Sequence, residues 1–130
     1  MINKIIIFII ILGIGYFLGN YFPFPFNLPF LQGDVRGETE LRVTVLVDNN
    51  QPVANLEVDV AEKPGPPPKG GAIETDEKGI ATFYLKPGVY YIYFNMKNFR
   101  SDLEPLPEGS KRIKVESGII NEETIILNSK

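Results

Sequence analysis

The sequence predicts an all-β fold, a seven-stranded antiparallel Greek-key sandwich preceded by one N-terminal transmembrane helix. Apolar and polar residues alternate with a period of two in several short segments after residue 37, which is typical of half-buried strands. Clusters of Gly, Pro, Asn and Asp separate these segments, as expected for tight turns between sandwich strands. Residues 5–22 contain no charged side chain, which is typical of a helix in lipid.

The first expected element is a signal-anchor helix over residues 1–22. Its 18 uncharged residues would span about 27 Å as a helix, close to the hydrocarbon thickness of a bilayer. Lys4 precedes this stretch and favours a cytoplasmic N-terminus with the rest of the chain outside. The alternative is a cleaved signal peptide, for which Gly13-x-Gly15 is a poor cleavage site. We therefore expect a single-pass protein of the cell membrane.

A stalk rich in Pro and Phe is expected over residues 23–37. Prolines at alternate positions end the helix and hold the chain extended, while aromatic residues suit the membrane–water interface. The stalk is interpreted either as a stiff segment that contacts lipid or as a docking strip for another membrane subunit. In the helix, Gly15 and Gly19 have the spacing that allows close helix packing. The candidate contacts with membrane lipid or a partner protein are Gly15, Gly19, Phe22, Phe24, Phe26 and Phe30.

The third expected unit is a water-soluble domain over residues 38–130. Turn chemistry at residues 49–52, 76–79 and 86–88 divides it into short strands. Because the sequence contains no Cys, apolar rows facing inward must stabilise the domain without a disulfide. The expected strands cover residues 41–47, 56–61, 72–75, 80–85, 89–95, 112–116 and 124–127.

Several short motifs occur in a fixed order within this domain: Pro52-Val53, Thr75-Asp76-x-x-Gly79 and Pro87-Gly88-x-Tyr90. With the strands between them, they resemble the carboxypeptidase regulatory-like, prealbumin-like (transthyretin-type) family of β-sandwiches. Asn55 stands where that family often has Gly. The resemblance implies a non-catalytic spacer, adhesion or accessory domain. The enzyme branch of this architecture uses His and a C-terminal Tyr-Arg-Gly-Ser, and this sequence has neither.

The composition excludes several further function classes. The absence of His and Cys removes most nucleophilic triads and the usual zinc sites, and a net charge of −3 without a basic cluster argues against a nucleic-acid partner. Asp48 and Asp76 lie in turns, but neither neighbourhood supplies the six to eight oxygens that Ca²⁺ prefers. We expect no catalytic residues, no metal and no cofactor, and therefore no enzyme.

Three tyrosines form the candidate binding face. Alternation turns Tyr84, Tyr91 and Tyr93 outward, and the turn at residues 86–88 is expected to bring Tyr84 close to Tyr91 across a hairpin. Exposed aromatic residues bind sugars and proteins well. The alternative is ordinary cross-strand packing, partly covered by a neighbouring loop. Residues 63–71 contain three consecutive prolines and form either a polyproline ligand or a stiff connection.

The sequence favours a non-catalytic accessory or structural protein of the cell envelope that acts through protein–protein contacts. Its expected partners are membrane lipid and another membrane or envelope protein. The alternative is an anchored surface module that binds polysaccharide or another cell surface through the tyrosine face.

Overall fold

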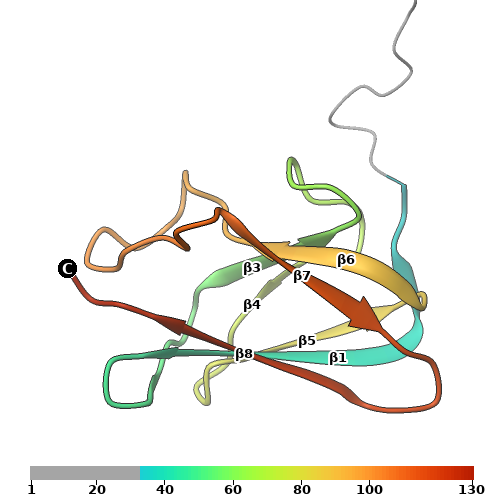
Figure 1. The fold of residues 1–130 in the computed structure, drawn as a ribbon, viewed down its shortest axis with the longest axis horizontal. Coiled ribbons are helices and arrows are strands. Elements are labelled where there is room, and N and C mark those ends of the chain that lie inside the picture. Colours follow the sequence, from blue (N-terminus) through green and yellow to red (C-terminus); the bar gives the residue numbers. More distant parts are fainter. Residues whose placement is uncertain (1–32) are drawn as a thin grey trace, which may run out of the picture.

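The computed structural model describes residues 33–130, which form two sheets packed face to face (Figure 1). Sheet A contains β1 (Arg36–Val47), β2 (Gln51–Pro52), β5 (Ile80–Leu85) and β8 (Asn121–Leu127). Sheet B contains β3 (Glu57–Ala61), β4 (Ala72–Glu74), β6 (Gly88–Tyr93) and β7 (Ser110–Val115). The predicted all-β sandwich is therefore confirmed for this part of the chain.

The predicted transmembrane helix and most of the predicted stalk lie outside the described residues. Within residues 33–130, no helix is long and apolar enough to span a membrane. β1 begins at Arg36, two residues before the expected start of the domain at residue 38. Val35 is already buried in the core, so the last stalk residues pack with the sandwich.

The strand count and the strand directions differ from the prediction. All seven expected segments contain a strand, and the two-residue β2 adds an eighth. β1 pairs antiparallel with β5 on one side and parallel with β8 on the other, so sheet A is mixed rather than wholly antiparallel. The alternation of side chains is the same in both kinds of pairing, which is why the sequence pattern did not reveal the parallel pair.

The expected hairpin between residues 80–85 and 89–95 is wrong. β5 pairs with β1 in sheet A, whereas β6 pairs with β3 and β7 in sheet B. The short connection therefore crosses from one sheet to the other. The Lys86 backbone N–H donates to the Val35 carbonyl at 3.0 Å, so it bonds to the start of β1 instead of closing a hairpin.

The core fills the space between the two sheets with inward-facing side chains from both. Phe83 is the largest of the fully buried side chains, and burying one such ring contributes roughly 1.5–3 kcal/mol. Strand residues in the core include Leu41, Val43, Val45, Val58, Val60, Ala81, Leu85, Tyr90, Ile92, Ile113, Val115, Ile125 and Leu127.

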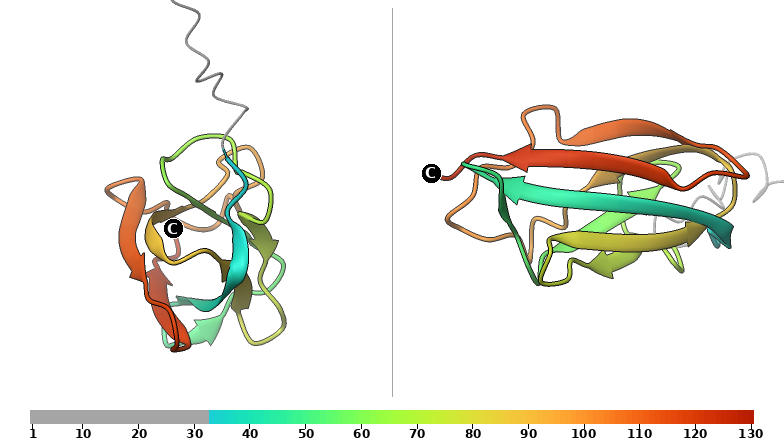
Figure 2. Two further views of the ribbon diagram at one scale, coloured as in Figure 1. Left: turned by 90° about the vertical axis from the view of Figure 1, so that its right-hand side faces the viewer. Right: turned by 90° about the horizontal axis from the view of Figure 1, so that it is seen from below.

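The two sheets differ in what covers their outer faces. No segment of residues 33–130 crosses the outer face of sheet A in the view from below (Figure 2).

The connection between β3 and β4 covers part of the outer face of sheet B (Figure 1). It contains the Pro-rich segment and is held at its end by the Val60 N–H, which donates to the Gly71 carbonyl at 2.7 Å. As a consequence, Asp59 and Tyr93 are buried although both point away from the core between the sheets.

Candidate functional site

The three predicted tyrosines do not form one face. Tyr84 lies on β5 in sheet A, opposite Glu40, and its side chain is 57% exposed. Tyr91 and Tyr93 lie on β6 in sheet B. The outer faces of the two sheets point in opposite directions, so the expected contact between Tyr84 and Tyr91 is wrong.

The alternative interpretation, packing beneath a neighbouring loop, describes Tyr93. This side chain is only 6% exposed, and it lines a cavity together with Gly65, Pro66 and Pro67 of the Pro-rich loop. Tyr91 is half-buried and stands between Ala61 of β3 and Arg112 of β7. The structure therefore leaves Tyr84 as the one strongly exposed member of the three.

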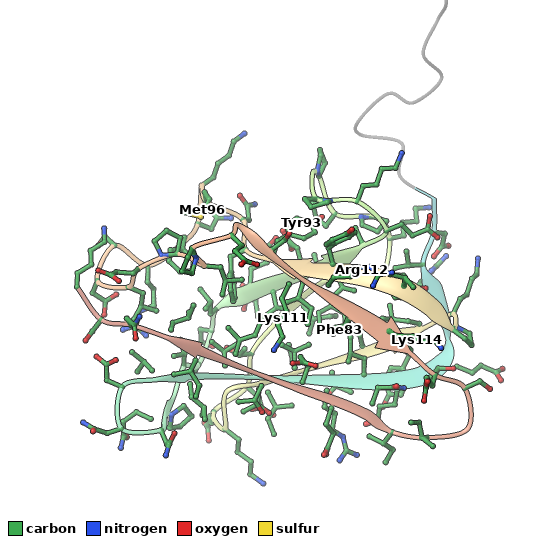
Figure 3. The ribbon with its side chains drawn as sticks, viewed as in Figure 1. Phe83, Tyr93, Met96, Lys111, Arg112 and Lys114 are labelled. Carbon is green, nitrogen blue, oxygen red and sulfur yellow. The ribbon has the colours of Figure 1, made fainter. Side chains whose placement is uncertain are left out.

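The cavity on the outer face of sheet B has a volume of about 420 Å³. The Pro-rich loop forms one wall, and the segment that follows β6 forms another (Figure 3). Asp59 of β3 and Tyr93 of β6 are directly opposite each other in the strand register. Its lining residues are Asp59, Gly65, Pro66, Pro67, Tyr93, Phe94, Asn95, Met96 and Lys97.

Asp59 is the most unusual ionisable group in this cavity. Its side chain is 1% exposed, and Oδ1 makes no hydrogen bond. Burial raises the pKa of this carboxyl to about 8, and the neighbouring Glu57 side chain adds to the shift. Asp59 therefore carries a proton at neutral pH. Sequence reasoning missed this residue because its place in the alternation indicated a solvent-facing acid; the Pro-rich segment directly after its strand was the available signal.

Other polar residues in the recognised motifs stabilise turns. The Thr75 hydroxyl donates to the Val53 carbonyl at 2.6 Å and accepts from the Leu56 N–H at 3.0 Å. Asp76 Oδ1 accepts from the Lys78 and Ile80 N–H groups at 2.8 and 3.0 Å. The Thr-Asp-x-x-Gly motif thus builds the turn that leads into β5.

The two loop acids considered as oxygen ligands are engaged in hydrogen bonds within the chain. Asp48 accepts from the backbone N–H and the hydroxyl of Ser129, which lowers the pKa of the Asp48 carboxyl. Asp76 is occupied by the turn described above. No group of three or more acidic side chains within residues 33–130 is placed to hold a metal ion.

Asn121 is a buried polar residue that the sequence did not single out. Its Oδ1 accepts from the Glu116 N–H at 2.9 Å, and its Nδ2 donates to the carbonyls of Glu116, Ile119 and Glu40 at 3.0 to 3.3 Å. Through these hydrogen bonds, Asn121 connects the turn between β7 and β8 to β1. The remaining predicted contacts, Gly15, Gly19, Phe22, Phe24, Phe26 and Phe30, lie outside the described residues and stay predictions.

Comparison with known proteins gives a likeness in fold. No protein-family model matches the sequence, and no characterised protein sequence is significantly similar to it. The fold resembles the Bacillus anthracis TIE protein, with 17% identity, a TM-score of 0.57, and coverage of 72% of this chain and 17% of that one. It also resembles GBS52, the minor pilin of Streptococcus agalactiae, with 17% identity, a TM-score of 0.58, and coverage of 74% and 46%.

A third similar structure is BcpA, the major pilin subunit of Bacillus cereus, with 16% identity, a TM-score of 0.57, and coverage of 71% of this chain and 29% of that one. The chain spans less than half the length of each of these three proteins. Residues 33–130 therefore have a β-sandwich fold similar to that of domains in pilin subunits.

Proposed function

We propose that this protein is a non-catalytic structural component of the cell surface, in which the sandwich is a rigid module that acts through protein contacts. The observation that carries the proposal is the fold, which resembles pilin subunits. The prealbumin-like motifs support the same function, since that resemblance implies accessory or spacer domains. The polar side chains of the motif turns serve the fold, as the hydrogen bonds of Thr75 and Asp76 illustrate.

The outer face of sheet A is the contact surface in this proposal. It presents Tyr84 and Ile126, which are 57% and 60% exposed. Between them in the sheet, Arg42 donates to Glu40 at 2.8 Å and lies 3.9 Å from Glu122, so the charges on this face are largely paired. A sheet face with exposed apolar side chains and paired charges suits a protein partner better than a strongly charged ligand.

Residues 1–22 anchor the module in the cell membrane, with the sandwich outside and residues 23–37 as the stalk. The uncharged run at residues 5–22 and the aromatic stalk support this arrangement. The partners are membrane lipid and another envelope protein. Extraction with alkaline carbonate distinguishes an uncleaved anchor, which remains in the pellet, from a cleaved signal, which releases a shorter chain with a lower intact mass.

The experiment that tests the function is the native size of the protein extracted from its own membrane in mild detergent. We expect migration in an assembly much larger than one chain. The double variant Tyr84→Ser, Ile126→Thr should shift the protein to a smaller species, whereas the matched control Glu77→Gln, an exposed change in a turn, should not. Migration of the unaltered protein as a monomer contradicts the proposal. It favours the alternative of a free-standing module that binds polysaccharide or another cell surface.

A further inference from the structure

The cavity beneath the Pro-rich loop has the features of a binding site that the proposed function does not use. It lies on the outer face of sheet B, opposite the surface assigned to assembly. Its volume of about 420 Å³ lies within the range of small-molecule sites. Figure 3 shows Met96 and Tyr93 close to the same upper edge of the molecule.

A buried carboxyl oxygen points to the chemistry of the ligand. Asp59 is 1% exposed and Oδ1 has no hydrogen-bond partner, although buried polar atoms are almost always paired. Leaving such an atom unpaired costs about 1–3 kcal/mol. Its neighbours on the same strand, Val58 and Val60, point into the core between the sheets, so Asp59, on the opposite face of the strand, takes no part in that core. An acceptor kept at this cost is explained by a donor that enters the cavity.

The remaining walls indicate the rest of the ligand. Pro66, Pro67 and Met96 provide apolar surface, and the ring of Tyr93 adds an aromatic wall. An anion would gain no charged partner from Asp59 and would lie close to the acidic side chain of Glu57, and a purely apolar ligand would leave Oδ1 unpaired. A primary ammonium donates three hydrogen bonds, and aromatic rings attract cations.

We propose that this cavity binds a primary ammonium group carried on an apolar chain, with Asp59 Oδ1 as the acceptor. Two sources have this chemistry, a free alkylamine and the lysine side chain of a partner protein. The inference stands on the cavity alone and holds whether or not the protein forms the assembly proposed above.

The charged groups around Asp59 are compatible with a cation in the cavity. Glu57 is on the same strand, Tyr93 faces Asp59 from β6, and the β4 residue opposite is Ala72. Lys97 also lines the cavity, but no ion pair within residues 33–130 joins it to Asp59. Because the Asp59 carboxyl is protonated at neutral pH, binding an ammonium ionises it and releases a proton. Affinity should therefore rise between pH 6 and pH 8.5, where an alkylamine remains charged.

The test uses the full-length chain in a non-ionic detergent and measures binding by calorimetry and by NMR of a ¹³C-labelled Asp carboxyl. The probes are n-pentylammonium chloride, Nα-acetyl-lysine methylamide and uncharged 1-pentanol. We expect pentylammonium to bind with proton release and Asp59→Asn to weaken binding at least tenfold. The control Glu77→Gln, which removes one exposed acid far from the cavity, should bind as the unaltered protein does.

Two outcomes overturn the proposal: equal affinity of pentylammonium for Asp59→Asn, and equal binding of 1-pentanol and pentylammonium to the unaltered chain. If Asp59→Asn fails to fold, Met96→Lys replaces it, because Met96 is strongly exposed and the new ammonium should compete with the ligand. Unchanged binding by Met96→Lys then counts against the proposal. Binding of the acetyl-lysine probe identifies a partner lysine as the source, whereas binding of pentylammonium alone identifies a free amine.

Discussion

At the residue scale, a few buried polar side chains control both the stability and the pH response of the sandwich. Thr75, Asn121 and Asp59 are the polar residues buried in residues 33–130. The first two make hydrogen bonds to backbone groups that would otherwise be unpaired. Asp59 makes no such bond through Oδ1, and we propose that this oxygen accepts a hydrogen bond from a ligand.

Thr75→Val should lower the free energy of unfolding by about 2 kcal/mol, because the change leaves the Leu56 N–H and the Val53 carbonyl without their side-chain partner. Urea unfolding followed by circular dichroism measures this loss. Thr75→Ser retains the hydroxyl and should recover most of the stability. A loss from Thr75→Ser as large as that from Thr75→Val would mean that the methyl group, and not the hydroxyl, stabilises the site.

Asp59 should make the protein less stable as the pH rises. The pKa of this carboxyl is about 8 in the folded protein and 3.8 in an exposed aspartate, so the folded chain holds the additional proton between these values. The free energy of unfolding should therefore fall between about pH 4 and pH 8, by more than about 1.4 kcal/mol, the equivalent of one pKa unit. Urea midpoints across this pH range measure the fall. Asp59→Asn should flatten the profile, and a profile unchanged by that substitution would contradict the assignment.

At the element scale, the strand edges and connections explain how the two sheets stay together. β7 is an edge strand of sheet B and carries three basic side chains, Lys111, Arg112 and Lys114 (Figure 3). Charged side chains on an edge discourage pairing with other chains. Lys111 also forms an ion pair with Glu123 of β8, which joins the edges of the two sheets.

Gly37 permits the close approach of β1 to the end of β5. A Cβ at this position would lie 2.4 Å from the Leu85 carbonyl carbon and from the Lys86 backbone nitrogen, so Gly37→Ala must displace backbone and should cost about 1–3 kcal/mol. Thermal unfolding measures the cost. Gly33→Ala is the matched control, because a Cβ there meets nothing within 4 Å. Equal melting temperatures for the two variants would show that β1 moves freely at this point.

At the scale of the whole molecule, the two outer faces differ in what covers them. The outer face of sheet A is open, and part of the outer face of sheet B lies beneath a loop that lines a cavity. The protein contact and the ligand site that we propose therefore lie on opposite faces, separated by the core.

The core residues identified in the sandwich all lie between Val35 and Leu127. We therefore expect a chain consisting of residues 33–130 to fold without the N-terminal segment and to unfold in a single cooperative transition. Urea unfolding monitored by tyrosine fluorescence and by circular dichroism tests this expectation. Transitions that do not coincide would contradict the single cooperative transition, and a lower urea midpoint than that of the full-length chain would show that residues 1–32 contribute to stability.

The sequence by itself determined the fold class, the positions of seven strands and the turn chemistry, because these depend on local alternation and local backbone preference. Asn49, Asn50 and Asn55, interpreted as turn residues or as replacements for Gly, do adopt positive φ values of 64°, 60° and 56°. Such values are costly for most side chains and tolerable for Asn. The inward rows of β1, β5 and β6 were predicted for the same local reason.

Only the tertiary structure decided which strands are neighbours. Alternation is the same for parallel and antiparallel pairs, and a short Pro-Gly connection suits a hairpin as well as a crossing between sheets. The sequence therefore placed Tyr84 beside Tyr91, whereas sheet assignment put them on opposite faces. The burial of Asp59 could not be predicted for a related reason. It depends on a loop that folds over the outer face of its strand, and local alternation gives no information about such a long-range contact.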